Sequence, residues 1–281
     1  MQNTSRMALG LVAAVALANG AASAQKKEFR YPVSPGASIS VANEFGPVTL
    51  RAGSGNQIVV TATRRSSKVE VDSTQHGNRV EVRSHFLQAA KPEEGRVDYE
   101  IQVPPDASVM VRVSAGPVKV QGLNGDISIE GENSPIEVRD SHGQIHARTV
   151  GGAITLTNLY DGHVEAMSVS GPVTLNNVAG KVVTANTTAG PITFSGDCAG
   201  EGQYSLSSHS GNIDVSLPAS ASVDLSARSV MGSVENEFPL QPPAHPTMAV
   251  NQGKSFAGTS NAGASSLRLR TFSGKIRVQK L

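Results

Sequence analysis

The sequence predicts an all-β chain that folds as a single-stranded parallel β-helix, or β-solenoid, with coils of 18–21 residues. A short motif predicts this: a small residue, then Pro or a small or polar residue, then an alternating apolar–polar–apolar strand. The motif occurs seven times, and successive starts lie 18, 18, 19, 19, 21 and 21 residues apart. Alternation with a period of two is typical of a strand with one buried face. The copies start at Gly116, Ser134, Gly152, Gly171, Gly190, Gly211 and Gly232.

A second glycine-led series lies between these copies, at Gly125, Gly143, Gly162 and Gly180, so each coil is expected to hold at least two strands with glycine at the corners. We expect the corner glycines to supply the positive φ that sharp bends need. Stacking the coils pairs each strand with its copies above and below. The predicted inward ladder is Val118, Ile136, Ile154, Val173, Ile192, Ile213 and Val234.

Composition agrees with a narrow aliphatic coil, because the 281 residues include no Trp and only 4% aromatic residues. The 24 Lys and Arg nearly balance the 23 Asp and Glu, and no basic run interrupts the balance, which argues against nucleic acid as a partner. The single cysteine, Cys198, excludes an intramolecular disulfide.

Residues 1–24 are predicted to be a cleaved signal peptide. Arg6 is followed by the apolar stretch Met7–Ala18 and by the small-residue sequence Ala22-Ser23-Ala24. The apolar stretch is shorter than the roughly 20 residues that a membrane-spanning helix needs. We therefore expect an exported protein, located in the periplasm, on the outer surface or outside the cell, with no transmembrane segment in the mature chain.

The remaining chain divides into four parts. Residues 25–112 have longer and unevenly spaced alternating runs, which predict an irregular, partly antiparallel region that caps the solenoid. Residues 113–237 carry the regular repeats. Residues 238–263 are rich in Pro, Gly and Ser and are expected to form a loop, and residues 264–281 return to the repeat pattern as a closing rung.

The repeated Ser-Gly-x-Ile/Val-x-Val steps, the Pro-Pro-Asp-Ala-Ser-Val sequence at Pro104–Val109 and the step Ser210–Pro218 resemble a known family. It is the bacterial β-strand-repeat family of candidate adhesins, domain of unknown function 4097 (DUF4097), and the similarity covers residues 38–281. The resemblance implies a right-handed β-helix-like solenoid exported to the bacterial envelope. It implies no enzymatic activity and carries no catalytic motif.

Outward positions of the first strand form a candidate ligand face rich in hydroxyl groups. A flat face of this kind could bind a glycan, ordered water or a partner surface, whereas the alternative is a solvated face that uses threonine for its β-propensity. The residues are Thr155, Thr157, Thr174, Asn176, Thr193 and Ser195.

Outward positions of the second strand bring together a candidate metal site of His146, His163 and Glu165. Aligned coils would place His146 about 4.8 Å from Glu165. Imidazole and carboxylate groups at that separation can hold Zn²⁺. The alternative is a set of solvated surface histidines, and no cofactor is predicted.

The sequence contains no reactive constellation that predicts catalysis. Glu130, Glu132, Glu137 and Asp140 cluster on neighbouring coils, but without the cleft or aromatic subsite of a glycosidase. The leading hypothesis is an exported, non-catalytic, adhesin-like or structural protein whose partner is an envelope or surface protein or glycan. The alternatives are a carbohydrate-active β-helix enzyme and an envelope module that binds a metal or small ligand.

Overall fold

The computed structural model describes residues 24–89, 91–198, 201–242, 251 and 253–281. Apart from Ala24, the predicted signal peptide lies outside the described residues. Every element in the described part is a β-strand, which confirms the all-β prediction. Its residues include no helix with the length and apolar character that a membrane span requires.

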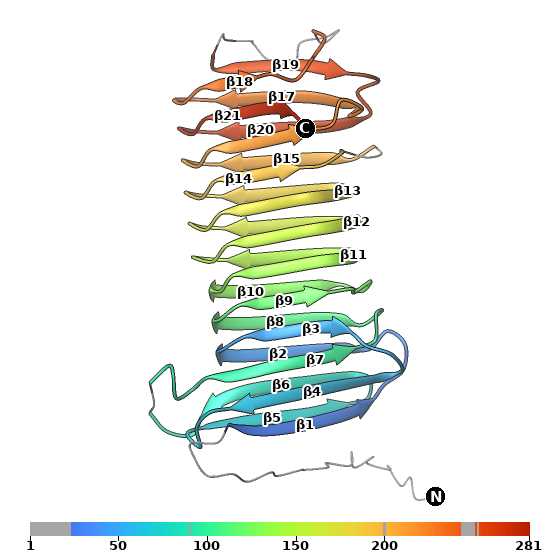
Figure 1. Cartoon of the computed structure of the whole chain (residues 1–281), viewed down its shortest axis with the longest axis vertical. Coiled ribbons are helices and arrows are strands. Elements are labelled where there is room, and N and C mark those ends of the chain that lie inside the picture. Colours follow the sequence, from blue (N-terminus) through green and yellow to red (C-terminus); the bar gives the residue numbers. More distant parts are fainter. Residues whose placement is uncertain (1–23, 90, 199–200, 243–250, 252) are drawn as a thin grey trace, which may run out of the picture.

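The strands form one continuous sheet that winds as stacked coils, each with one strand on each of two faces (Figure 1). The first face stacks β5 (Val69–His76), β6 (Arg79–Phe86), β2 (Ser38–Phe45), β8 (Ser108–Ala115), β10 (Ile127–Asn133), the second halves of β11 (Ile136–Thr149), β12 (Ile154–Ser168) and β13 (Val173–Thr187), β15 (Gln203–Ser208), β20 (Ser265–Thr271), β17 (Val223–Ser229) and β19 (Ser255–Ser260).

The second face continues each coil around the core. It stacks β1 (Gln25–Pro32), β4 (Gln57–Arg64), β7 (Val97–Val103), β3 (Val48–Ala52), β9 (Val118–Gln121), the first halves of β11, β12 and β13, β14 (Ile192–Ser195), β16 (Ile213–Leu217), β21 (Ile276–Lys280) and β18 (Val234–Asn236).

Pairing is parallel through the body of the stack and antiparallel near its ends. The antiparallel pairs are β1–β4, β4–β7 and β5–β6 at one end and β17–β19 at the other. The first three lie in the N-terminal region, where a partly antiparallel arrangement was expected. The right-handed sense of the coil stays a prediction.

Aliphatic side chains from both faces fill one shared core. Val118, Ile136, Ile154, Val173, Ile192 and Ile213 are buried and in register, as the alternation predicts. The two faces meet across the core, where Phe194 of β14 lies edge-on to Tyr204 of β15 with ring centroids 5.8 Å apart. The buried aliphatic area is the main favourable contribution to folding.

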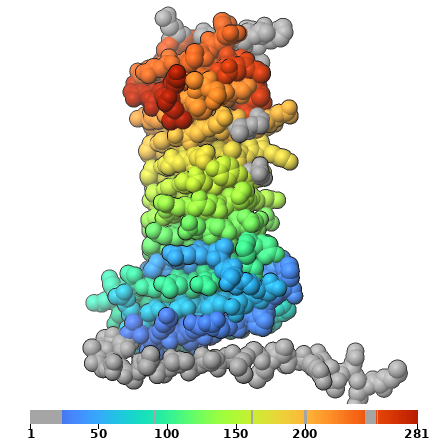
Figure 2. Space-filling view, turned by 45° about the vertical axis from the view of Figure 1, so that its right-hand side comes forward, coloured from blue at the N-terminus to red at the C-terminus, as the bar shows by residue number. Residues whose placement is uncertain are grey.

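The last segment of the chain does not close the stack, and that prediction for residues 264–281 is wrong. β20 pairs with β15 on one side and β17 on the other, and β21 lies likewise between β16 and β18. In Figure 2 the red C-terminal residues accordingly lie beside orange ones rather than beyond them. The physical reason is that β17 and β18, and not the C-terminal segment, form the last coil, and β19 covers the edge of β17.

The expected loop over residues 238–263 also needs correction, because it contains β19. This strand pairs antiparallel with β17 from Val223–Ser260 to Arg228–Ser255. An open strand edge presents unpaired backbone groups, and an added strand satisfies them. The capping strand was therefore not predicted, because the segment is rich in Pro, Gly and Ser, a composition typical of a loop.

At the N-terminal end, too, one coil is inserted between two coils that follow it in the sequence. The coil formed by β2 and β3 lies between β6–β7 and β8–β9, although β4 to β7 follow it in sequence. The coil of β2 and β3 is thus enclosed by its neighbours, as the coil of β20 and β21 is at the other end, whereas the first strand, β1, lies at the outer edge beside β4.

Most corner glycines are required for a reason other than positive φ. Gly116 and Gly143 do have positive φ, at 135° and 97°. At Gly152, Gly171 and Gly211, however, φ lies outside that region, and an added Cβ would collide with a backbone carbonyl of the neighbouring coil. Close stacking, rather than backbone conformation, excludes side chains there.

Candidate functional site

The six hydroxyl and amide residues predicted to form a ligand face do lie together on the outside of the second face. Thr155, Thr174 and Thr193 are in register, and so are Thr157, Asn176 and Ser195. They alternate with fully buried residues such as Leu156 and are half-buried or exposed. The structure therefore forms the predicted row of outward side chains, and ligand binding by it stays a prediction.

Charged side chains lie on both sides of this row, and several of them form ion pairs. On one side, Glu137 accepts from Lys119 at 3.2 Å and also from Arg139. On the other side, Glu235 pairs with Lys275 at 2.6 Å and with Arg277 at 3.7 Å. The hydrogen bond from Lys275 holds the pKa of Glu235 below its ordinary value. The central row is thus uncharged and hydroxyl-rich, with the ion-paired Glu137 beside Thr155 on one side and Asp214 beside Thr193 on the other.

On the first face, the predicted proximity of His146 and Glu165 is confirmed. The two residues are in direct register, and Nδ1 of His146 lies 2.9 Å from a carboxylate oxygen of Glu165. They line an open hollow of about 250 Å³ together with Ser128, Glu130, Arg148 and Met167.

His163 does not complete a metal centre with this pair. Its ring centroid is 5.9 Å from that of His146, and its backbone is in register with Gln144 of β11 and Val182 of β13. Within the ranges that the structure describes, no group of three or more His, Cys, Asp or Glu side chains could hold a metal ion. The predicted alignment of the coils is present here, with Gln144 opposite His163 and His146 opposite Glu165. The shared register is therefore not enough to direct the three side chains at one ion.

One corner of the stack holds a ladder of hydroxyl groups that was not predicted from the sequence. The Oγ of Ser168 accepts from the backbone N–H of Gly171 at 2.9 Å and donates to the carbonyl of Gly152 in the neighbouring coil at 3.4 Å. Thr271 makes the same two bonds, with Gly274 and Gly211. The available signal was a Ser or Thr three residues before the glycine, as at Gly152, Gly171, Gly190, Gly211, Gly232 and Gly274. The ladder bonds the stacked corners to one another.

The opposite corner holds a second missed ladder. Asp140, Asn158 and Asn177 have positive φ of 51°, 54° and 54°, a conformation that Asn and Asp tolerate better than other side chains. Asn158 donates to Asp140 at 2.9 Å and Asn177 donates to Asn158 at 3.0 Å. The hydrogen bond from Asn158, with a second from Gln121, lowers the pKa of Asp140.

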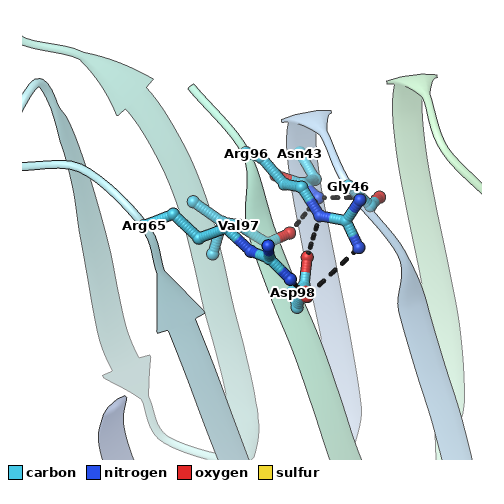
Figure 3. A network of polar contacts seen from close by, with 6 residues as sticks. All are labelled: Asn43, Gly46, Arg65, Arg96, Val97 and Asp98. Atoms are coloured by element: carbon cyan, nitrogen blue, oxygen red, sulfur yellow. Dashed lines mark hydrogen bonds and ion pairs between the residues drawn. The ribbon is translucent and has the colours of Figure 1, made fainter. Parts of the chain in front are cut away.

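A polar network fastens the inserted N-terminal coil (Figure 3). Buried Asn43 donates to the carbonyls of Gly46 at 3.1 Å and Val97 at 3.0 Å. Arg96 donates to Asp98 at 2.7 Å, and Arg65 lies 3.8 Å from the same carboxylate. The bond to Asp98 raises the pKa of Arg96 above its already high ordinary value. The residues bridge the β2–β3 turn and β7, so their role is structural.

Cys198, the one cysteine, is buried with 2% of its surface exposed. Burial raises the pKa of its thiol to about 12. A reactive cysteine needs an accessible thiolate near neutral pH. Cys198 is therefore a small residue of the hydrophobic core.

These features define a β-solenoid repeat protein whose two outer faces carry continuous rows of side chains. The family model described as Toastrack DUF4097 matches residues 37–279, and the chain belongs to that family. The family resemblance seen in the sequence is thereby confirmed. No curated protein matches the chain.

Several solved structures are similar at low identity. A candidate adhesin from Bacteroides fragilis is 11% identical, with 92% of this chain and 99% of that chain covered and a TM-score of 0.47. A candidate cell adhesion protein from Clostridium sporogenes is 12% identical, with 91% and 100% covered and a TM-score of 0.29. A candidate adhesin from Parabacteroides merdae is 10% identical, with 91% and 96% covered and a TM-score of 0.27.

Proposed function

We propose that this protein is an exported, non-catalytic, adhesin-like solenoid that recognises an envelope or surface partner through its outward side-chain rows. The observation that carries this is the in-register repetition of outward residues, as in Thr155, Thr174 and Thr193. A hydrogen-bonded stack holds such a row rigidly, so little conformational entropy is lost when an extended partner binds. Repeat proteins use extended surfaces of this kind for binding.

The directions of the pKa shifts support a non-catalytic role. Hydrogen bonds from neighbouring side chains lower the pKa of Glu94, Asp140 and Glu235. Burial raises the pKa of Cys198 and Tyr204 to about 12. A general acid working near neutral pH needs the opposite shift of a carboxyl, and a nucleophilic thiol needs the opposite shift of a cysteine.

Export is part of the proposal. It is supported by the predicted signal peptide at residues 1–24. The location decides which partners are accessible. Protease treatment of intact cells, before and after the outer membrane is permeabilised, separates a surface location from a periplasmic one. Protection in permeabilised cells as well would contradict export.

The binding role is tested by coating beads with the purified protein and counting the cells or envelope fragments that they retain. Thr174→Glu with Thr193→Glu places two carboxylates on the second face, and Thr184→Glu with Ser205→Glu makes the same in-register change on the first face. We expect binding by the wild-type protein and its loss in at least one of these variants. Beads that retain nothing would overturn the proposal, and release of reducing ends from a polysaccharide panel would favour the carbohydrate-active alternative.

A further inference from the structure

Three exposed arginines gather on the first face near the C-terminal end of the stack. Arg268 and Arg270 project from β20, and Arg228 projects from the adjacent β17. Arg270 and Arg228 are in direct register. Neighbouring strands lie about 4.8 Å apart and residues two apart along a strand about 6.8 Å, so the three side chains start from one small area.

The pairing of Arg270 with Arg228 is unlike the other charge contacts. Among the register pairs of the described strands, it alone joins two Lys or Arg residues, and none joins two acids. Elsewhere opposite charges meet: Glu130 lies between Arg112 and Arg148, for example. Like charges placed directly opposite destabilise a sheet.

The three arginines also outnumber the acids on their own strands, since Asp224 is the one acid on β17 and β20. None of the three forms an ion pair with another residue that the structure describes. The acid on β17, Asp224, is in register with Ser266 and not with an arginine. An unpaired basic cluster of this kind has a net attraction for an acidic partner, because its positive charge is not neutralised within the fold.

Hydroxyl groups and an aromatic pair border the cluster. Ser205 and Ser207 of β15 are in register with Arg268 and Arg270. At the edge, the rings of His209 and Phe272 stack with centroids 4.9 Å apart and planes within 2°. Phe272 is 45% exposed. The threonine row of the second face has no such aromatic group at its six positions.

We propose that Arg228, Arg268 and Arg270 bind an acidic polysaccharide whose carboxylate groups they neutralise. The planar guanidinium group suits bidentate recognition of carboxylate. The serine hydroxyls can bond to sugar hydroxyl groups, and the ring pair offers an apolar surface for a sugar face. This inference rests on the proposed binding function and specifies the face and the chemical class of ligand.

The test measures binding of the purified protein to polygalacturonate by biolayer interferometry, with neutral dextran as the uncharged comparison. We expect binding to polygalacturonate that weakens between about 50 and about 200 mM salt, because charge neutralisation contributes to it. The variant Arg228→Gln with Arg270→Gln should lose at least about tenfold in affinity. The control variant Arg79→Gln with Arg112→Gln removes the same charge from ion-paired arginines on the same face, and should stay within about twofold.

A melting curve of each variant separates lost binding from lost folding. The Arg228→Gln, Arg270→Gln variant should melt at the same or a higher temperature, because it removes a like-charge contact. Unchanged affinity in that variant, or an equal loss in the control variant, would overturn the inference. Binding to phosphatidylglycerol vesicles but not to polygalacturonate would show that the ligand class is wrong.

The same experiments distinguish this inference from the proposed function. If coated beads retain cells while polygalacturonate does not bind, only the assignment of the arginine cluster fails. If the beads retain nothing, the general binding role fails, whatever polygalacturonate does.

Discussion

Ile276 lies directly beside Ile213 in the core, although more than a full coil of sequence separates the two residues. On its other side, Ile276 is in register with Val234. The C-terminal coil therefore holds two earlier coils together, and its removal would expose both of them.

Substitution of Ile276 by Ala tests this position. Ile276 is fully buried between two coils, so the loss of its side chain should cost about 2–5 kcal/mol in the free energy of unfolding. Val234 is only half-buried, and Val234→Ala should cost about 1 kcal/mol. Chemical denaturation of both variants gives the comparison. A larger cost for Val234→Ala would contradict the inserted order of the coils.

The order of the coils shows the limit of prediction from this sequence. Alternation is a local property, so the inward positions of Ile154 or Val173 follow from the sequence alone. The stacking order is not local, because β21 carries the same Ile-x-Val pattern as β16 and could pair with any coil. For the same reason the Arg228–Arg270 contact was not predicted, since it depends on the placement of β20 against β17.

The candidate sites divide in the same way. Rows made from equivalent positions of regular coils, such as Thr155 with Thr174, were predicted because equal spacing brings them together. The same spacing correctly placed His146 opposite Glu165, but the metal centre with His163 did not form. A regular repeat predicts which backbone positions lie side by side, but it does not predict how long side chains at those positions are directed.

Polar substitution of the core tests the inward and outward assignment. Ile154→Asp or Val173→Asp would bury a carboxylate without a partner, which costs several kcal/mol and should prevent folding. Thr155→Asn, one position away on the outer side, adds no charge opposite Glu137 and should change stability by less than about 0.5 kcal/mol. Circular dichroism and thermal melting compare the variants. Equal effects at positions 154 and 155 would show that the assignment is wrong.

Close stacking of the corners predicts a strong effect of adding one methyl group. At Gly171 a Cβ would collide with the carbonyl of Gly152, so Gly171→Ala should cost about 3 kcal/mol or more. Gly55 has nothing within 4 Å of the Cβ position but has a φ of 88°. Gly55→Ala should therefore cost only about 1 kcal/mol through backbone strain. Urea denaturation measures both, and similar costs would argue against close stacking as the cause.

Cys198 should resist thiol reagents in the folded protein. Its pKa is raised to about 12 by burial, so almost no thiolate is present at pH 8, and the side chain is inaccessible. In denaturant the thiol should react fast, and the ratio of the two rates measures local opening. Rapid labelling of the native protein would contradict the core position of Cys198.

The ladder of Asp140, Asn158 and Asn177 predicts a pH dependence. Hydrogen bonds from Asn158 and Gln121 favour the ionised carboxylate, so the pKa of Asp140 is lower in the folded than in the unfolded chain. The corresponding stabilisation is present above the unfolded pKa of about 3.9 and is lost as the pH falls through the folded pKa. Asn158→Ala removes the principal donor, so the pKa of Asp140 should rise towards its ordinary value, as measured by NMR titration. Asn177→Ala, which removes a residue that does not contact Asp140 directly, is the matched control, and an equal rise in both variants would mean that the bond from Asn158 is not the cause.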